Sequence, residues 1–216
     1  MYQVTVGICC YKQKKWLHRC LRSLASQTFT KNLFEVIVVN DDPTEKLEEI
    51  CKTMKKHLNI TLINNSENIG LPKSLNKILK IAKGRYFTRV DSDDFVSKHF
   101  LYMLHTYLFS NRKIQAVACD YKKVNEVGEN INIHCSAKKN FIACGVMFTY
   151  ESLCDLEFYN ENFKMREGHE LIKRFTEKYK LEYLKIPLYR YRIHSTNRTK
   201  NKEATKKFDC LLENND

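Results

Sequence analysis

The first ninety residues alternate short apolar runs with longer amphipathic stretches, and this alternation limits the fold more than any other feature of the sequence. Four of the apolar runs have the length and composition of strands: residues 4–9, 34–39, 60–63 and 85–90. Three stretches between them repeat apolar residues at helical spacing: 16–24, 47–58 and 71–82. Strands that alternate with helices of this length predict an α/β fold, in which a parallel sheet is covered by helices on both faces.

The second half of the chain is less regular. Its patterns predict, in order, a helix at 97–110, a strand at 115–119, a hairpin turn at 127–130, an apolar segment at 142–148, a helix at 169–178 and extended segments at 183–193 that are broken at Pro187. The last sixteen residues are mostly polar, and the sequence contains no repeat and no long linker. We therefore expect a single domain that ends in a short tail.

Two acidic clusters follow strands of the predicted sheet. Asp41 and Asp42 follow the second strand, and residues 91–94 (Asp-Ser-Asp-Asp) follow the fourth. Ligands of parallel sheets bind beyond the carboxyl ends of the strands, so both clusters are expected at one edge. Carboxylates that lie together repel one another unless a cation holds them, and a divalent ion with oxygen ligands is the usual cation. A solvated turn or a helix cap is the alternative explanation for each cluster alone.

The chain carries 37 Lys and Arg against 25 Asp and Glu, a net charge of +12. Such an excess indicates an anionic partner, and nucleic acid, anionic lipid and a phosphorylated substrate all fit it. No apolar run is long enough to span a bilayer, and the N-terminus lacks the pattern of a secretory signal. We expect a cytoplasmic protein, with residues 198–207 in peripheral contact with an anionic inner membrane surface.

Nine cysteines are scattered over the chain without a CxxC pair. An odd number at irregular spacing argues against a zinc site and against a disulfide framework. We expect reduced thiols, several of which pack as small hydrophobic side chains.

Several segments taken together resemble the inverting glycosyltransferases of family 2, which have the GT-A fold. The similarity is specific over about residues 3–96: the opening strand (4–11), the first helix (16–28), the strand before the nucleotide-base turn (34–45), the Asn-x-Gly segment (68–76) and the strand that leads into the DxD motif (84–94). Further on, residues 166–174 resemble the segment with the catalytic base, and residues 191–197 resemble a late Tyr-Arg-x-His element.

The resemblance implies a GT-A-type fold with a mixed, mainly parallel central sheet flanked by helices. Residues 1–96 would form the Rossmann-like, nucleotide-sugar-binding half of a single domain, residues 97–200 the acceptor-binding half, and residues 201–216 a short polar C-terminal tail. The implied reaction moves a sugar from a nucleotide-sugar donor, foremost a UDP-sugar, to an acceptor hydroxyl with inversion and with help from a metal ion. The acceptor would be a glycan or a lipid-linked saccharide, as in polysaccharide biosynthesis.

The resemblance also assigns roles to individual residues. Asp93 would hold Mn²⁺ or Mg²⁺, with Asp91 and His194 as further metal ligands. Asp41 would accept a hydrogen bond from the nucleotide base, with Asp42 as the fallback. The other donor-binding candidates are Cys9, Tyr11, Gly70, Lys73, Asp91 and Ser92, of which Tyr11 could stack on the base and Lys73 could meet a phosphate. For Tyr11, Lys73 and His194 a purely structural role explains the residue equally well.

The sequence departs from the family pattern where the catalytic base is expected. Gly168 stands where many members carry aspartate after glutamate, so another side chain must take the proton from the acceptor hydroxyl. Glu167 is the first candidate, Glu170 the second and His169 the third. An acidic residue in the first turn of a helix is also ordinary, which is the structural explanation for Glu170.

Two other functions compete with glycosyl transfer. A sugar-phosphate nucleotidyltransferase needs a glycine-rich phosphate loop after its first strand, and residues 9–13 (Cys-Cys-Tyr-Lys-Gln) contain no glycine. A non-catalytic nucleic-acid binder would use the positive charge, but it leaves both acidic clusters unexplained, and these would repel phosphates. We therefore expect no nucleic-acid partner.

Overall fold

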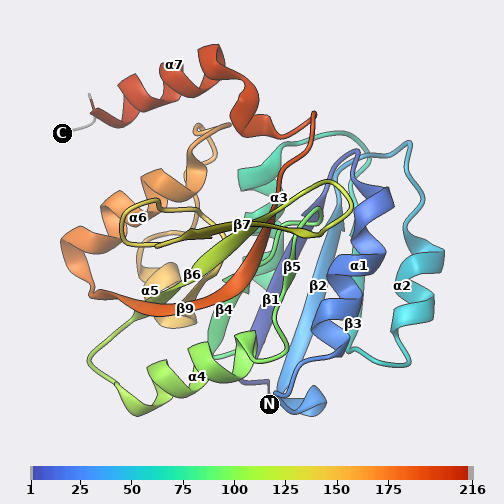
Figure 1. Ribbon diagram of the computed structural model, residues 1–216, viewed down its shortest axis with the longest axis horizontal. Coiled ribbons are helices and arrows are strands. Elements are labelled where there is room, and N and C mark those ends of the chain that lie inside the picture. Colours follow the sequence, from blue (N-terminus) through green and yellow to red (C-terminus); the bar gives the residue numbers. More distant parts are fainter. Residues whose placement is uncertain (1, 214–216) are drawn as a thin grey trace.

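The computed structural model describes residues 2–213, and within them a nine-stranded sheet forms the centre of the molecule (Figure 1). The strands lie in the order β3-β2-β1-β4-β8-β6-β9-β5, and β7 pairs with β6. Their bounds are β1 (Val4–Cys10), β2 (Phe34–Asn40), β3 (Ile60–Asn64), β4 (Tyr86–Arg89), β5 (Phe95–Val96), β6 (Ala116–Val124), β7 (Asn130–Cys135), β8 (Val146–Thr149) and β9 (Leu181–Arg192).

Helices cover both faces of this sheet (Figure 1). They are α1 (Lys14–Ala25), α2 (Glu48–Met54), α3 (Leu71–Ile81), α4 (Phe100–Ser110), α5 (Tyr150–Asp155), α6 (Glu167–Lys178) and α7 (Lys202–Glu213), with short 3-10 turns at Lys31–Leu33 and Arg198–Lys200. Apolar residues of α1, α2 and α4 pack against one face, and those of α3, α5 and α6 pack against the other.

Strands β1 to β4 form the parallel half that the sequence predicts. Every residue of β2 is buried: Val36 and Val38 face one hydrophobic cluster, while Ile37 and Val39 face the other. A strand that is covered on both faces requires such a continuous apolar run, because successive side chains point to opposite sides. The expected α/β class, with a mixed sheet flanked by helices, is confirmed.

The second half completes the sheet with mixed pairing. Strand β8 lies antiparallel between β4 and β6, whereas β6 and β9 run parallel. Residues 181–192 form one continuous strand and not the separate segments expected from Pro187. The pairing with β6 shifts register on both sides of Pro187, which suits a residue that has no N–H to donate.

Two helices of the second half differ from what the sequence predicts. Helix α6 begins at Glu167, two residues earlier than its apolar pattern indicates. Residues 202–213, expected to belong to a polar tail, form helix α7, which lies at the top of the view in Figure 1. Among the described residues, no helix has the length and apolar character that crossing a membrane requires.

Candidate active site

One pocket lies at the carboxyl ends of β1, β2 and β4, with a cavity volume of about 520 Å³. The segment 141–144, the start of α6 and residues 191–205 form its other walls. Eight of the residues singled out from the sequence line this pocket: Cys9, Tyr11, Asp41, Gly70, Asp91, Asp93, Glu167 and His169. Five others lie outside its wall: Asp42, Lys73, Ser92, Glu170 and His194. The two acidic clusters therefore meet at one sheet edge, as the strand order requires.

Asp93 and His194 form a buried pair at the floor of the pocket. Asp93 Oδ2 lies 2.8 Å from Nε2 of His194 and accepts a hydrogen bond from Gln13 at 2.9 Å. The imidazole is fully buried, its Nδ1 lies 2.9 Å from the hydroxyl of Thr196, and its ring packs on Trp16 with centroids 4.1 Å apart. His194 therefore lies behind Asp93 and reaches the pocket only through that carboxylate.

Ser92 stabilises the same turn from outside the pocket wall. Its hydroxyl donates to Oε1 of Gln13, whose amide nitrogen holds Asp93. The sequence offered no signal for Gln13, because it lies eighty residues before Asp93 and belongs to no acidic cluster. Ser92 thus contributes by orienting Gln13.

Asp91 is tied to Glu167 by one buried arginine. Arg89 donates to both oxygens of Asp91, at 2.5 and 3.0 Å, and its third nitrogen donates to Glu167 Oε1 at 2.7 Å. Burial favours a raised pKa for Asp91, but the charge and hydrogen bonds of Arg89 outweigh it and leave the pKa lowered. The guanidinium of Arg89 thus serves these two carboxylates.

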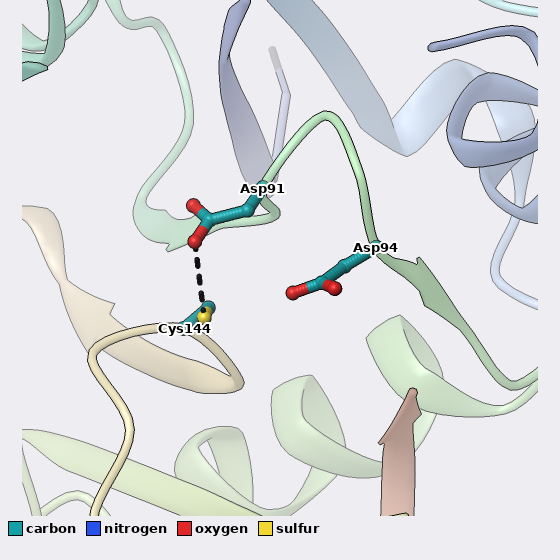
Figure 2. Close-up of side chains that lie close together, drawn as sticks. All are labelled: Asp91, Asp94 and Cys144. Carbon is teal, nitrogen blue, oxygen red and sulfur yellow. Dashed lines mark hydrogen bonds between the residues drawn. The ribbon is translucent and has the colours of Figure 1, made fainter. Parts of the chain in front are cut away.

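Asp91, Asp94 and Cys144 bring three ligand atoms within 4.8 Å of one another (Figure 2). The Cys144 thiol donates to Asp91 Oδ2 at 3.4 Å, and burial raises its pKa. Asp94 accepts from the hydroxyl of Tyr189 at 2.8 Å and from the backbone N–H of Arg192 at 2.7 Å. Arg89 already donates to both oxygens of Asp91, so this carboxylate is bound within the protein.

Asp41 organises the loop that borders the pocket beside β2. Its carboxylate accepts from the side chain of Asn65 at 2.8 Å and from the backbone N–H groups of Ile69 and Gly70, both at 3.0 Å. Gly70 has a φ of +87°, a conformation that glycine adopts without strain. Asp41 therefore both faces the pocket and fixes the Asn-x-Gly segment in place.

Asp42 and Lys73 take structural or solvent-facing positions. Asp42 turns toward Thr44, accepting from its N–H at 2.9 Å and its hydroxyl at 2.7 Å, and these bonds lower the pKa of Asp42. Lys73 lies exposed on α3. In contrast, Tyr11 lines the pocket with 41% of its surface exposed, and the ammonium of Lys12 lies 5.2 Å from the centre of its ring.

The three candidates for the base have different surroundings. Glu170 is held by Arg174 through two hydrogen bonds, at 2.6 and 2.9 Å, and lies outside the pocket wall. Glu167 lines the pocket, and its Oε2 has no hydrogen-bond partner among residues 2–213. His169 also lines it, and burial lowers the pKa of its imidazole, with a further contribution from Arg166.

Gly168 has no room for a side chain. A Cβ atom at this position would lie 2.1 Å from the Cβ of Ala143, far inside the contact distance of two carbons. The aspartate that the family pattern favours at this position is therefore excluded by packing as well as by sequence.

The sheet topology and the acidic pocket at its edge define a glycosyltransferase of the GT-A class. The sequence model of the glycosyl transferase family 2 matches residues 5–187, and the chain belongs to this family.

The chain is similar to TarS of Staphylococcus aureus, a poly(ribitol-phosphate) beta-N-acetylglucosaminyltransferase, with 36% identity over 102 residues, or 47% of this chain. The crystal structure of TarS residues 1–349 superposes with a TM-score of 0.80 at 22% identity, covering 97% of this chain and 64% of that one. A mannosyltransferase of Pyrobaculum calidifontis, solved with GDP-Man and Mn²⁺, gives a TM-score of 0.76 at 16% identity over 100% of this chain and 66% of that one.

This chain spans only a part of its curated relatives. It covers 18% of the length of TarS and 35% of an uncharacterized glycosyltransferase of Haemophilus influenzae, to which it is 36% identical over 118 residues, or 53% of this chain.

Proposed function

We propose that this protein transfers a sugar from a nucleotide-sugar donor to an acceptor hydroxyl, with inversion at the sugar carbon. The observation that carries the proposal is the convergence, at one pocket, of Asp93 backed by His194, of Asp91 held by Arg89, and of Glu167, whose Oε2 has no hydrogen-bond partner among residues 2–213. These groups meet the needs of the reaction: charge neutralisation at a leaving diphosphate and proton removal from an acceptor.

The donor set supports Mn²⁺ or Mg²⁺ as cofactor. Asp93 and His194 would hold the ion, since Oδ2 of the one lies 2.8 Å from Nε2 of the other. A carboxylate and an imidazole fit Mn²⁺, which leaves further coordination positions for phosphate oxygens and water. When bound, the ion would neutralise charge on the departing diphosphate.

The donor is expected to be a UDP-sugar. TarS has been solved in complex with UDP-GlcNAc, and its fold covers 92% of this chain. In this chain the base would stack on Tyr11 and reach Asp41, while Arg89 keeps Asp91 ionised at the donor side of the pocket. A glycan or a lipid-linked saccharide is the acceptor class that we propose, as in polysaccharide biosynthesis.

A screen of UDP-, GDP-, CMP- and dTDP-sugars, with and without Mn²⁺, tests this function. We expect a UDP-sugar to bind, to bind more tightly with the ion, and to be hydrolysed slowly when no acceptor is present. If none of these donors bound, or if the protein instead bound nucleic acid in a salt-sensitive manner, the proposal would be refuted.

Replacement of Asp41 by alanine is expected to weaken nucleotide binding even without metal. The change removes the proposed contact to the base and also releases the N–H groups of Ile69 and Gly70. Isothermal titration with UDP measures the effect, and Asp42→Ala is the matched control because Asp42 lies outside the pocket wall. Equal dissociation constants for Asp41→Ala and wild type would exclude Asp41 from donor binding.

The net charge of +12 predicts that this protein binds peripherally to an anionic membrane surface. Residues 198–207 include the turn Arg198–Lys200 and the start of α7, next to the pocket. Recovery with anionic vesicles should exceed recovery with neutral ones and should fall as salt is added. Equal recovery with both vesicle types would exclude this contact.

A further inference from the structure

Helix α7 presents one stripe of residues to the segment that carries the proposed base. Thr205, Phe208, Asp209 and Leu212 recur at the spacing of a single helical face. Thr205 lines the pocket, the ring of Phe208 lies 6.0 Å from that of Phe163, and the carbonyl of Leu212 accepts from Lys173 at 2.8 Å. The C-terminal helix therefore contacts α6 and the residues before it through individual side chains.

The central contact of this stripe is an ion pair between Asp209 and Arg166. Nε of Arg166 lies 2.7 Å from Oδ1 of Asp209, and Nη2 donates to Oδ2 at 3.1 Å. The pair therefore joins the two side chains by charge and by one hydrogen bond, the one from Nη2. The third nitrogen of Arg166, Nη1, lies 3.4 Å from Nε2 of His169.

Arg166 also occupies an unusual backbone position. It is the residue before the first turn of α6, and its φ of +62° and ψ of +16° lie in the left-handed region, which non-glycine residues rarely adopt. Its carbonyl accepts the N–H groups of His169 and Glu170, so this one residue sets where α6 starts. The direction in which Glu167 and His169 leave the helix depends on it.

We propose that Asp209 is a positioning residue: through its ion pair with Arg166, helix α7 holds the left-handed turn from which Glu167 and His169 face the pocket. The catalytic consequence rests on the proposed function. The structural consequence does not, because the surroundings of His169 can be measured without any substrate.

Four charged groups act on the pKa of His169. Burial lowers the pKa of the imidazole, and so do the charges of Arg166 and Arg89. The carboxylates of Glu167 and Asp209 act in the opposite direction, because a negative charge favours the protonated ring. Phe141 packs edge-on against the ring, with centroids 5.3 Å apart, and adds no charge. Removal of the charge of Asp209 is therefore expected to lower the pKa of His169 further.

The test compares Asp209→Asn with Asp209→Glu and with Glu203→Gln, an exposed acid on the same helix whose loss changes the net charge equally. In Asp209→Asn we expect turnover to fall by between about tenfold and about 10²-fold, since misplacement of a reacting group by about 1 Å can cost that much. The dissociation constant of the donor should not change. Titration of His169 by NMR should give a lower pKa than in wild type.

Asp209→Glu should have the turnover and the His169 pKa of the wild type, and Glu203→Gln should leave both quantities at the wild-type level. If Asp209→Asn keeps the wild-type turnover and the wild-type pKa of His169, the positioning role is refuted. If wild type transfers no sugar from any donor, the proposed function fails. The NMR titration of His169 then decides the structural claim by itself.

Discussion

Asp93→Asn is expected to abolish metal-dependent sugar transfer while the protein remains folded. The substitution removes the carboxylate charge that would hold the ion but keeps a side chain that can still bond to Gln13 and His194. Charge stabilisation by a catalytic metal is worth several kcal/mol, and each 1.36 kcal/mol is tenfold, so the rate should fall by at least about 10²-fold. Initial rates measured over a Mn²⁺ titration give the effect.

The matched control for this experiment is Asp42→Asn, an acid at the same sheet edge that bonds to Thr44 and lies outside the pocket wall. It should keep the metal-dependent rate. His194→Gln should resemble Asp93→Asn, because the imidazole is the partner of that carboxylate. Full activity of Asp93→Asn, or of wild type in EDTA, would show that the ion is not held here or is not needed.

Glu167→Gln is expected to reduce turnover by about 10² to 10⁴-fold, the usual range for loss of a general base. An acceptor hydroxyl is a weak nucleophile at neutral pH, and Glu167 lines the pocket with an Oε2 that has no hydrogen-bond partner among residues 2–213. Donor affinity should barely change, because the base acts on the acceptor. Single-turnover rates together with donor titrations separate the two quantities.

Glu170→Gln is a close control for this substitution. It makes the same chemical change on the same helix turn, but its carboxylate is bound by Arg174 and lies outside the pocket wall. His169→Ala tests the remaining candidate, whose pKa is lowered by burial and which is therefore neutral and able to accept a proton. Near-normal turnover in Glu167→Gln with a large loss in His169→Ala would move the role to His169.

Thermal unfolding of Glu167→Gln checks that the loss is chemical. Glu167 accepts from buried Arg89, and the amide leaves that guanidinium with Asp91 as its only charged partner among the described residues. The variant is therefore expected to be less stable. A transition as cooperative as that of wild type, at a temperature above that of the assay, assigns the rate loss to the base.

The elements of the first half could be read from the sequence with little error. Strand β2 and helices α1 and α3 follow from apolar runs and helical spacing, both of which act within a few residues. The edge on which Asp41 and Asp93 meet follows as well, because parallel strands place their carboxyl ends together. The second half was predicted less accurately: its strand β9 continues past Pro187, and its polar end forms a helix.

The sequence by itself determined the α/β class, the acidic edge and the absence of an acid at position 168, because each depends on local residue pattern. Only the tertiary structure decided which side chains bind one another. His194 bonds to Asp93, Arg89 bonds to both Asp91 and Glu167, and Asp209 pairs with Arg166. Except for Arg89 and Asp91, which are two residues apart, these contacts join residues 43 to 101 positions apart along the chain. Neither periodicity nor propensity carries information over such separations, since the packing of the sheet and its helices brings these side chains together.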